Sequence, residues 1–385
     1  MRRTSGSFLA AFFLVLICCS EPLAGPKVAV VKTDIAKAAA EDYKFSMAIL
    51  DYDWSKPVEK IKKNESTWGP ESQAAIEKVV REAIKLSGDW PVKPGQTVFI
   101  KPNLVVGPRT MQGMNRLKSE EILATMTDAR VARAVGLVAL ESGASKVFWG
   151  DIPSGGDSYG TAKGWGYEAV VDELNAKFPE KNVLLNLNAV PYKFYKPKNT
   201  GGLALKEYAI PEIFVNTDVI ISVPKMKTHS FAGVSGSLKN IGLGVPISSL
   251  YGQSKWGLPH RRLPEVVVDI CDIVKIGYTV VDAIWAMEGN GPALGKPVAM
   301  NVIIAGKDPV AVDWTACELM GIRGDSIGIV RLAKSHKLGT YENVEIVGTP
   351  IQQAMQQFEP VPRENRVAGP GGYSHNVGWG PDAVK

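Results

Sequence analysis

Residues 225–244 combine cationic side chains with glycines, directly after a predicted buried strand at residues 219–223. Besides four glycines, the segment supplies Lys225, Lys227, His229, Lys239 and Asn240. Glycine lets the backbone approach a ligand closely and aim its N–H groups at it. Lysine and histidine add positive charge, hydrogen-bond donors and a nucleophile. We therefore predict a loop that forms part of a binding site, rather than a solvated basic turn.

Polar side chains also follow other predicted strands of the chain. In order, they are Lys101 and Asn103 after residues 97–100, Asp151 after 146–149, Asp282 and Glu288 after 278–281, and Asp308 after 300–305. Ligands of parallel sheets bind beyond the carboxyl ends of the strands. We expect these side chains and the basic segment to meet in one shared site.

The elements that must position these residues alternate along the chain. Further strands are predicted at residues 28–31 and 183–187, and helices at 72–86, 128–142, 167–177, 264–275, 310–320 and 325–335. This alternation predicts an α/β fold with a mainly parallel sheet flanked by helices. We expect a signal peptide at 1–25, an extension with the first helix at 26–96, a main domain at 97–350 and a Pro- and Gly-rich tail at 351–385. Within the main domain, subdomains of about 97–223 and 224–350 would enclose a cleft.

The N-terminus has the order of a secretory signal. Arg2 and Arg3 precede an apolar run at residues 8–19, which is too short to span a bilayer. We expect an exported protein, periplasmic or extracellular, with no transmembrane span. A lipoprotein interpretation would place a lipid anchor at Cys19, although Cys18 stands where a small residue is preferred.

Composition narrows the class of protein further. The 385 residues are 45% hydrophobic and 22% charged, which suits a large buried core. The net charge of +5 comes without a long basic cluster, so we expect no nucleic-acid partner. Outside the signal only Cys271 and Cys317 remain, and no CxxC motif is present. We expect two buried thiols, with one disulfide as the alternative, and neither a zinc ribbon nor an iron–sulfur cluster.

An ordered set of motifs over roughly residues 97–325 resembles the domain of unknown function 362 family. The motifs lie at residues 98–103, 127–128, 150–151, 224–229, 237–240, 281–292 and 306–313. Many members of that family carry an added ferredoxin module. This chain lacks the cysteines of such a module, so the resemblance does not extend to an iron–sulfur cluster.

A shorter stretch, from His229 to Lys239, is similar to the HxxAGxSGGxK motif of the nickel-pincer lactate racemase family. The two residues lie ten positions apart, as in that motif. The resemblance implies that Lys239 anchors a pyridinium-derived cofactor and that His229 takes part in proton transfer. Here Ser237 replaces the second glycine, and Leu238 replaces the basic residue before the lysine. His260 is the candidate downstream metal ligand, although its offset differs.

These observations give a candidate site. Its catalytic candidates are His229, Lys239, Asp282 and Glu288, its ligand-binding candidates are Lys101, Asn103, Asp151, Lys225, Lys227, Asn240 and Arg261, and its metal candidate is His260. Neighbouring positive charge favours neutral His229, which suits a base. Asp282 and Glu288 could form a carboxylate pair or serve as a strand-end cap and a turn residue. His260 and Arg261 could form an anion clamp or a solvated basic patch.

Two functions remain open on this basis. The first is an exported enzyme of racemase or isomerase type, which binds a small carboxylate- or phosphate-bearing molecule with a divalent metal or a lysine-linked nickel-pincer-type cofactor. The second is a non-catalytic binding protein or scaffold for an anionic metabolite, which needs the lysines but neither His229 nor the carboxylates. The chain contains no GxSxG, Walker, HExxH or GxGxxG motif, which argues against serine hydrolases, NTPases, zincins and dinucleotide enzymes.

Overall fold

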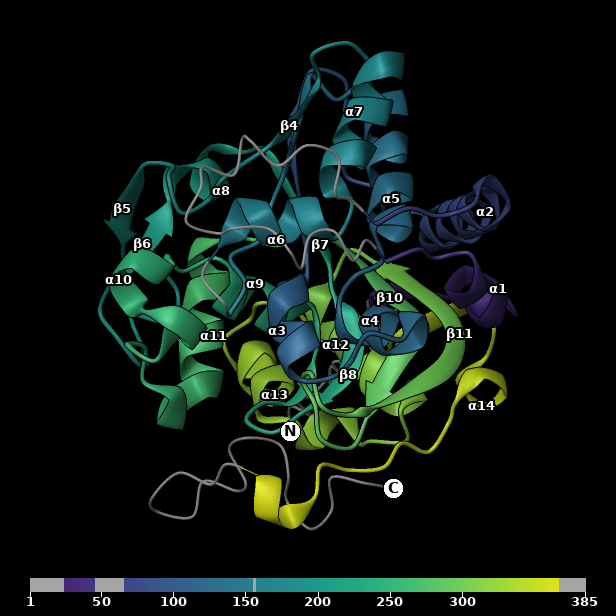
Figure 1. The fold of residues 1–385 in the computed structure, drawn as a ribbon. Helices are drawn as coiled ribbons and strands as arrows, with labels where there is room; N and C mark the ends of the chain where they lie inside the picture. The colour runs from purple at the N-terminus through teal and green to yellow at the C-terminus, as the bar shows by residue number, and fades with distance from the viewer. Residues whose placement is uncertain (1–23, 46–65, 155–156, 367–385) are drawn as a thin grey trace, which may run out of the picture.

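A ten-stranded mixed sheet forms the centre of the protein in this computed structural model, which describes residues 24–45, 66–154 and 157–366 (Figure 1). The strands are β1 (Lys27–Lys32), β2 (Thr97–Pro102), β3 (Lys146–Trp149), β4 (Asn182–Leu184), β7 (Val219–Val223), β8 (Lys225–His229), β9 (Gly233–Ser235), β10 (Tyr278–Glu288), β11 (Lys296–Gly306) and β12 (Glu345–Gly348). The main order is β12-β1-β11-β10-β7-β2-β3-β4. Neighbours from β10 to β4 are parallel, whereas β11 is antiparallel to both β1 and β10. This arrangement confirms the predicted mainly parallel α/β sheet.

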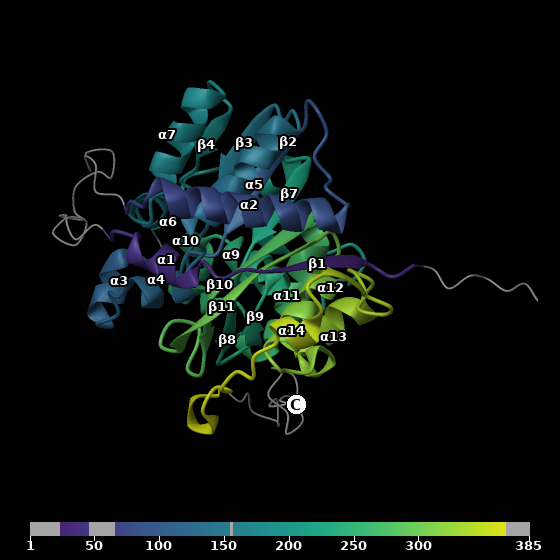
Figure 2. The same ribbon diagram turned by 90° about the vertical axis from the view of Figure 1, so that its right-hand side faces the viewer.

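Helices cover both faces of the sheet. One layer contains α2 (Pro70–Ser87), α4 (Ser119–Thr125), α5 (Ala129–Glu141) and α7 (Tyr167–Lys177); the other contains α9 (Ser237–Gly244), α11 (Leu263–Ile273), α12 (Pro309–Leu319) and α13 (Gly328–Ser335). Figures 1 and 2 show α2 and α5 side by side. In β2, Val98 and Ile100 pack under the first layer and Phe99 under the second, because successive strand residues point to opposite faces.

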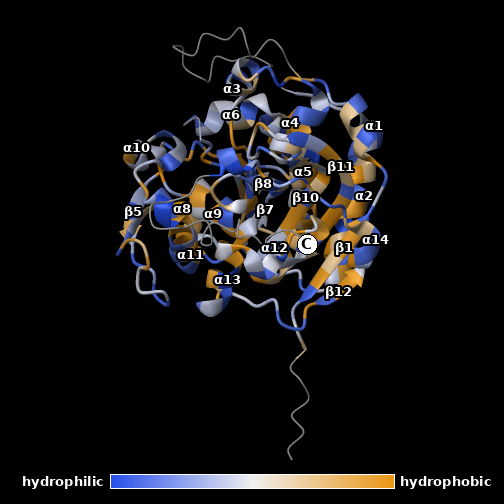
Figure 3. Ribbon diagram, turned by 90° about the horizontal axis from the view of Figure 1, so that it is seen from below, coloured by the Kyte–Doolittle hydropathy of each residue, from blue (hydrophilic) through white to orange (hydrophobic). Residues whose placement is uncertain are grey.

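Strands that are buried on both faces explain the continuous apolar runs of the sequence. In β1, the residues Val28, Ala29 and Val30 are fully buried, between α2 on one side and the second helical layer on the other. Figure 3 shows β1, β10 and β11 as largely hydrophobic ribbons. The same burial fixes the strand register, and with it the positions at which polar residues follow the strands.

The hairpin of β10 and β11 is longer than its predicted strands at residues 278–281 and 300–305. Its pairing continues from Thr279 opposite Gly306 to Glu288 opposite Lys296, with a bulge after Ala283. Asp282 and Glu288 therefore lie within a strand, and the prediction that they follow its end is wrong. Antiparallel pairing with β11 extended the strand beyond the apolar run that marked it.

Residues 225–244 are ordered elements and not the predicted loop. β8 pairs with both β10 and β9, and α9 follows directly after Gly236. The backbone of β8 pairs with both neighbours, and local composition does not show such tertiary pairing.

The domain boundaries at the ends of the chain remain predictions. The predicted signal residues up to 23, including Cys19, and the tail from residue 367 lie outside the described residues. Before that point the tail adds α14 (Ile351–Ala354) and buries Phe358 in the core. Strands from both sides of the 223/224 boundary join one sheet, so the two subdomains remain a prediction.

Among the described helices, none has the length and apolar character needed to cross a membrane. Cys271 and Cys317 are buried free thiols, as expected.

Candidate functional site

A cavity of about 200 Å³ lies beyond the carboxyl ends of the adjacent strands β2 and β3. Its polar lining comes from Asn103, Asp151, Ser154, Lys227, His229, Ser230, Lys239, Asn240, Ser254, Lys255 and His260. The structure thus brings together in one cavity seven of the residues that the sequence placed in the site, as the strand-end rule led us to expect. Of the predicted set, Asn103, Asp151, Lys227, His229, Lys239, Asn240 and His260 line the cavity itself.

Helix α9 presents Lys239 to the cavity. The lining positions Lys239, Asn240, Leu243 and Gly244 lie one turn apart on one face of this helix, while Leu238 and Ile241 are buried in the core. The start of α9 is fixed from α12, because the Asp313 carboxylate accepts hydrogen bonds from Ser237 N (2.6 Å) and Leu238 N (3.0 Å). Burial raises the pKa of Asp313 to about 7 despite these two donors. A side chain at Gly236 would collide with the Asp313 carboxylate, with its Cβ only 2.5 Å away.

A buried cluster below the cavity anchors α9 to the ends of β2 and β3. Lys101 Nζ forms an ion pair with Asp151 and donates a hydrogen bond to Asn240 Oδ1 at 2.7 Å. Asn240 Nδ2 in turn donates to the carbonyl of Lys101 at 3.0 Å. The second Asp151 oxygen accepts from Leu104 N at 2.7 Å. Burial lowers the pKa of Lys101, and the charge of Asp151 opposes this effect. The only carboxylate of the described cavity lining is therefore already neutralised by a lysine.

Gly244 is required for this cluster to close. A Cβ at this position would lie 2.1 Å from Lys101 Nζ and 2.8 Å from an Asp151 oxygen. The C-terminal turn of α9 therefore approaches the ion pair as closely as backbone can.

The amine of Lys239 is the most available cation of the cavity. The side chain is partly buried, and its Nζ forms no hydrogen bond or ion pair with another residue that the structure describes. Burial, together with the positive charge of Lys101, lowers the pKa of Lys239 to about 8. A substantial fraction of this amine is consequently unprotonated in mildly alkaline solution.

Lys227 and His229 extend from β8 into the opposite wall. Lys227 is 1% exposed, and its Nζ donates to the carbonyls of Thr125 (2.6 Å) and Pro292 (3.1 Å). Nδ1 of His229 accepts from the backbone N–H groups of Phe231 (3.1 Å) and Ala232 (3.3 Å). Burial, followed by the charge of Lys239, lowers the pKa of both Lys227 and His229 well below their usual values.

Aromatic rings form the remaining wall. The ring of Trp256 lies 4.4 Å from that of His260 at an angle of 31°, and Phe231 meets both rings edge-on. Trp256 is nevertheless 63% exposed. Nδ1 of His260 lies 3.0 Å from the Leu258 carbonyl, and burial lowers the pKa of His260. The cavity therefore combines an apolar rim with a cationic floor.

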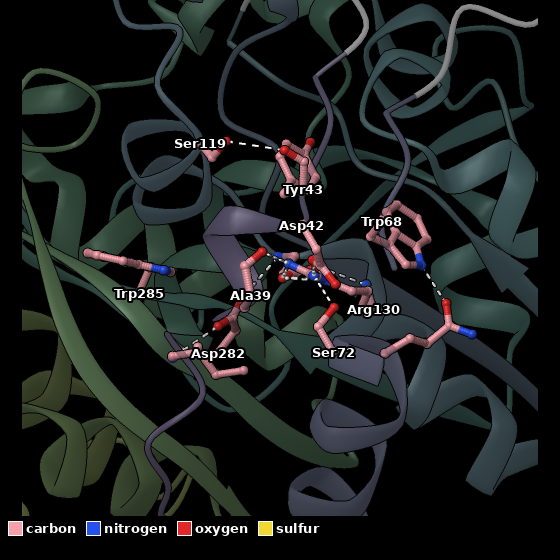
Figure 4. A network of polar contacts seen from close by, with 12 residues as sticks. Ala39, Asp42, Tyr43, Trp68, Ser72, Ser119, Arg130, Asp282 and Trp285 are labelled. Atoms are coloured by element: carbon pink, nitrogen blue, oxygen red, sulfur yellow. Dashed lines mark hydrogen bonds and ion pairs between the residues drawn. The ribbon is translucent and has the colours of Figure 1, made fainter. Parts of the chain in front are cut away.

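Lys225 and Asp282 pair with each other outside the cavity. Their ion pair measures 2.8 Å, and both side chains are almost completely buried. Asp282 also accepts from Asp128 N at 2.8 Å, which joins it to the polar network of Figure 4. In that network the Arg130 guanidinium binds the carboxylates of Asp128 and Asp42. Burial raises the pKa of Asp282 against the opposing charge of Lys225. This pair holds β8 on β10 and ties the N-terminal extension to the sheet.

The other predicted site residues lie elsewhere. Glu288, at the end of β10, accepts a hydrogen bond from Glu359 N at 2.9 Å, and Arg261 is an exposed residue of the short 3-10 helix His260–Arg262. Neither lines the cavity. Within the described ranges, no group of three or more His, Cys, Asp or Glu side chains is arranged to hold a metal ion.

Lys255 is a cavity residue that the sequence interpretation missed. Its side chain is 3% exposed and donates to the Ile152 carbonyl at 3.0 Å, while burial lowers its pKa to about 8. Ser254 and Lys255 both adopt positive φ angles of 54° and 59°, a strained conformation that often marks functional sites. The available signal was a Lys-Trp pair between Gly252 and Gly257, away from any predicted strand end.

Comparison with known proteins places the chain in a family. A profile of the family described as domain of unknown function (DUF362) matches residues 98–318, which is more than half of the chain. The chain belongs to the DUF362 family. Within the DUF362 region lie all of the polar cavity residues, from Asn103 to His260.

The thylakoid-associated protein of Synechocystis sp. is a relative of this DUF362 protein. The two are 26% identical over 249 residues, which cover 64% of this chain and 70% of the relative. Two solved structures show more distant likeness. The lactate racemase apoprotein of Thermoanaerobacterium thermosaccharolyticum matches with a TM-score of 0.36 and 13% identity, over 64% of this chain and 55% of its own. A structural-genomics protein of Thermotoga maritima matches with a TM-score of 0.32 and 10% identity, over 68% of this chain and 59% of its own.

Proposed function

We propose that this DUF362 protein binds a small anionic molecule in the cavity, with Lys239 as its main contact. The observation that carries the proposal is the charge of the lining. Lys227, Lys239 and Lys255 face a space of about 200 Å³, and Asp151, the one carboxylate in the described lining, is paired with Lys101. Lysines that are buried without counter-ions either cost free energy as cations or lose their protons, and a bound carboxylate or phosphate stabilises their charged form.

The remaining lining indicates what else the ligand carries. Oδ1 of Asn103 has no hydrogen-bond partner in the described part of the chain, so it is available to a hydroxyl or amine group. Trp256, Phe231 and His260 offer rings to an apolar portion of the ligand. A small acid with a neighbouring donor group suits this set.

An enzyme of racemase or isomerase type is the favoured form of this function, and a non-catalytic binding protein is the second. The His229–Lys239 motif and the lowered pKa values around it support the enzyme. Lys239 suits the attachment of a lysine-linked cofactor, because its amine is unpartnered among the described residues and lines the cavity. Such a group would supply an electron-accepting centre, and the lysines would hold its acidic parts. A divalent metal fits less well, since the described side chains include no suitable cluster.

Export to the periplasm or the extracellular space is part of the same proposal, and it is based on the signal-like N-terminus alone. N-terminal sequencing of the protein from its own host tests it. We expect a mature terminus within or just after residues 20–25, whereas an intact Met1 in a membrane-free fraction would contradict export.

Calorimetric titration with acetate, lactate and inorganic phosphate tests the binding function. We expect at least one of them to bind, and Lys239→Met to weaken that binding about tenfold or more, because a charge-assisted hydrogen bond is lost. Lys85→Met, at an exposed position of α2, is the matched control and should bind as the unaltered protein does. Equal affinities for Lys239→Met and Lys85→Met would refute the assignment.

A kinetic criterion separates the two forms of the function. If Lys239→Met abolishes a measured interconversion of enantiomers or isomers, the protein is an enzyme. If the protein binds the anion and no interconversion is detectable with the protein from its own host, the binding protein is favoured.

A further inference from the structure

Of the two lysines in β8, Lys225 pairs with Asp282, whereas Lys227 has no balancing carboxylate among the residues that the structure describes. On the basis of the proposed anion-binding function, we infer that the unprotonated amine of Lys227, and not the ring of His229, is the proton acceptor of the cavity. The ligand class that follows is a weak acid, bound together with one proton.

The two hydrogen bonds of Lys227 satisfy every donor that an uncharged amine has. Its Nζ donates to the carbonyls of Thr125 and Pro292, at 2.6 and 3.1 Å, and forms no ion pair with a described carboxylate. An uncharged amine has two N–H groups and one lone pair, so these two carbonyls use all of its donors. Because Lys227 lines the cavity, the third tetrahedral position is the one left for a ligand.

The charges around Lys227 also favour the uncharged amine. The cations Lys239, from α9, and Lys225, from β8 itself, both act on it, and among the described carboxylates Asp151 opposes them. Asp151 is bound to Lys101, and Lys225 is bound to Asp282. An ammonium that is 1% exposed among these groups would lack both water and a counter-ion.

The ring lone pair of His229 is already used by backbone donors. Its Nδ1 accepts two backbone N–H groups, from Phe231 and Ala232, so the proton of the neutral ring lies on Nε2. In this tautomer Nε2 is a donor and not a proton acceptor. Backbone donors fix the tautomer because they cannot rotate away.

The proton transfer to Lys227 needs no reactant other than the acid itself. When an acid enters the cavity, its O–H bond breaks and the Nζ lone pair of Lys227 forms an N–H bond. The products are an anion and an ammonium ion at the same site, next to the ammonium of Lys239. When the ligand enters as an anion from neutral solution, the same proton comes from the buffer.

Calorimetric titration with sodium lactate at pH 6.5, in buffers of different ionisation enthalpy, counts the protons taken up. At this pH Lys239, with a pKa of about 8, is already about 97% protonated and contributes little. We expect an uptake of about one proton for the unaltered protein and for His229→Gln, and close to none for Lys227→Met. No uptake by the unaltered protein, or an uptake that His229→Gln abolishes and Lys227→Met keeps, would overturn the inference.

If lactate does not bind, that result counts against the proposed function alone. The protonation state of Lys227 can still be measured in the protein without ligand. In protein labelled with ¹³C-lysine, the Lys227 Cε resonance is identified by its loss in Lys227→Met, after circular dichroism has confirmed that this variant folds. From pH 6.5 to 9 we expect the chemical shift of a neutral amine, because burial and the neighbouring lysines lower the pKa of Lys227 well below its usual value. A Lys227 resonance at the ammonium position throughout this range would refute it.

Discussion

The lowered pKa of Lys239 predicts selective chemical reactivity of its amine. At pH 8 about half of the Lys239 side chains are unprotonated, because their pKa is about 8, against about 0.3% of lysines with the usual value of 10.5. The free amine is therefore roughly 150 times more abundant at this position. A less basic amine is also a weaker nucleophile. If nucleophilicity falls with pKa as it does for thiols, the expected rate advantage of Lys239 over an ordinary lysine is about tenfold.

Competitive labelling with a trace of acetic anhydride, followed by peptide mass spectrometry, measures this reactivity at each lysine. We expect Lys239 to be acetylated about ten times faster than Lys85 at pH 8, with a midpoint near pH 8. Lys255, which has a similar pKa, is the internal comparison. It should react slowly, because its side chain is buried and donates to the Ile152 carbonyl. A Lys239 rate that equals that of Lys85, or a midpoint near pH 10.5, would refute the argument from burial and charge.

Three predictions concern stability and are measured by urea unfolding. Asp282→Ala leaves Lys225 as an unpaired buried cation and should lower the free energy of unfolding by about 3–5 kcal/mol. The double variant with Lys225→Met should recover a large part of this loss. No recovery would contradict the ion-pair explanation. Gly244→Ala should cost about 1–3 kcal/mol, because its Cβ collides with the buried lysine below the cavity, whereas Gly113→Ala, with open space around it, should cost nothing. Burial lowers the pKa of Lys255 to about 8, so the unfolded chain binds more protons between about pH 8 and 10.5 and stability rises with pH. From pH 7 to 9.5 this rise should be about 2 kcal/mol larger than in Lys255→Met, and equal pH profiles would contradict it.

The sequence predicted the sheet and the location of the cavity because both depend on local patterns. The apolar runs at β2, β3 and β7 are buried on both faces, and each is followed by polar residues at the carboxyl end. Parallel neighbours bring those ends together without any further information. Lys101 and Asp151 were therefore assigned to one place although 50 residues separate them.

Tertiary pairing produced the features that the sequence did not reveal. Lys225 and Asp282 lie in adjacent strands at paired positions, so they neutralise each other instead of facing a ligand. Lys255 enters the cavity through two residues with left-handed backbone, a geometry that composition does not encode. Whether a buried lysine acts as a cation, an ion-pair partner or a base depends on its neighbours, and these become known only with the fold.

A crystal structure of the protein with a bound ligand would show whether the cavity binds a small anion through Lys239. We expect an acidic group of the ligand within hydrogen-bonding distance, about 3 Å, of Lys239 Nζ, with Lys227 Nζ in reach of the same molecule. A ligand that binds at another surface, while the cavity between α9 and β8 holds only water, would contradict it.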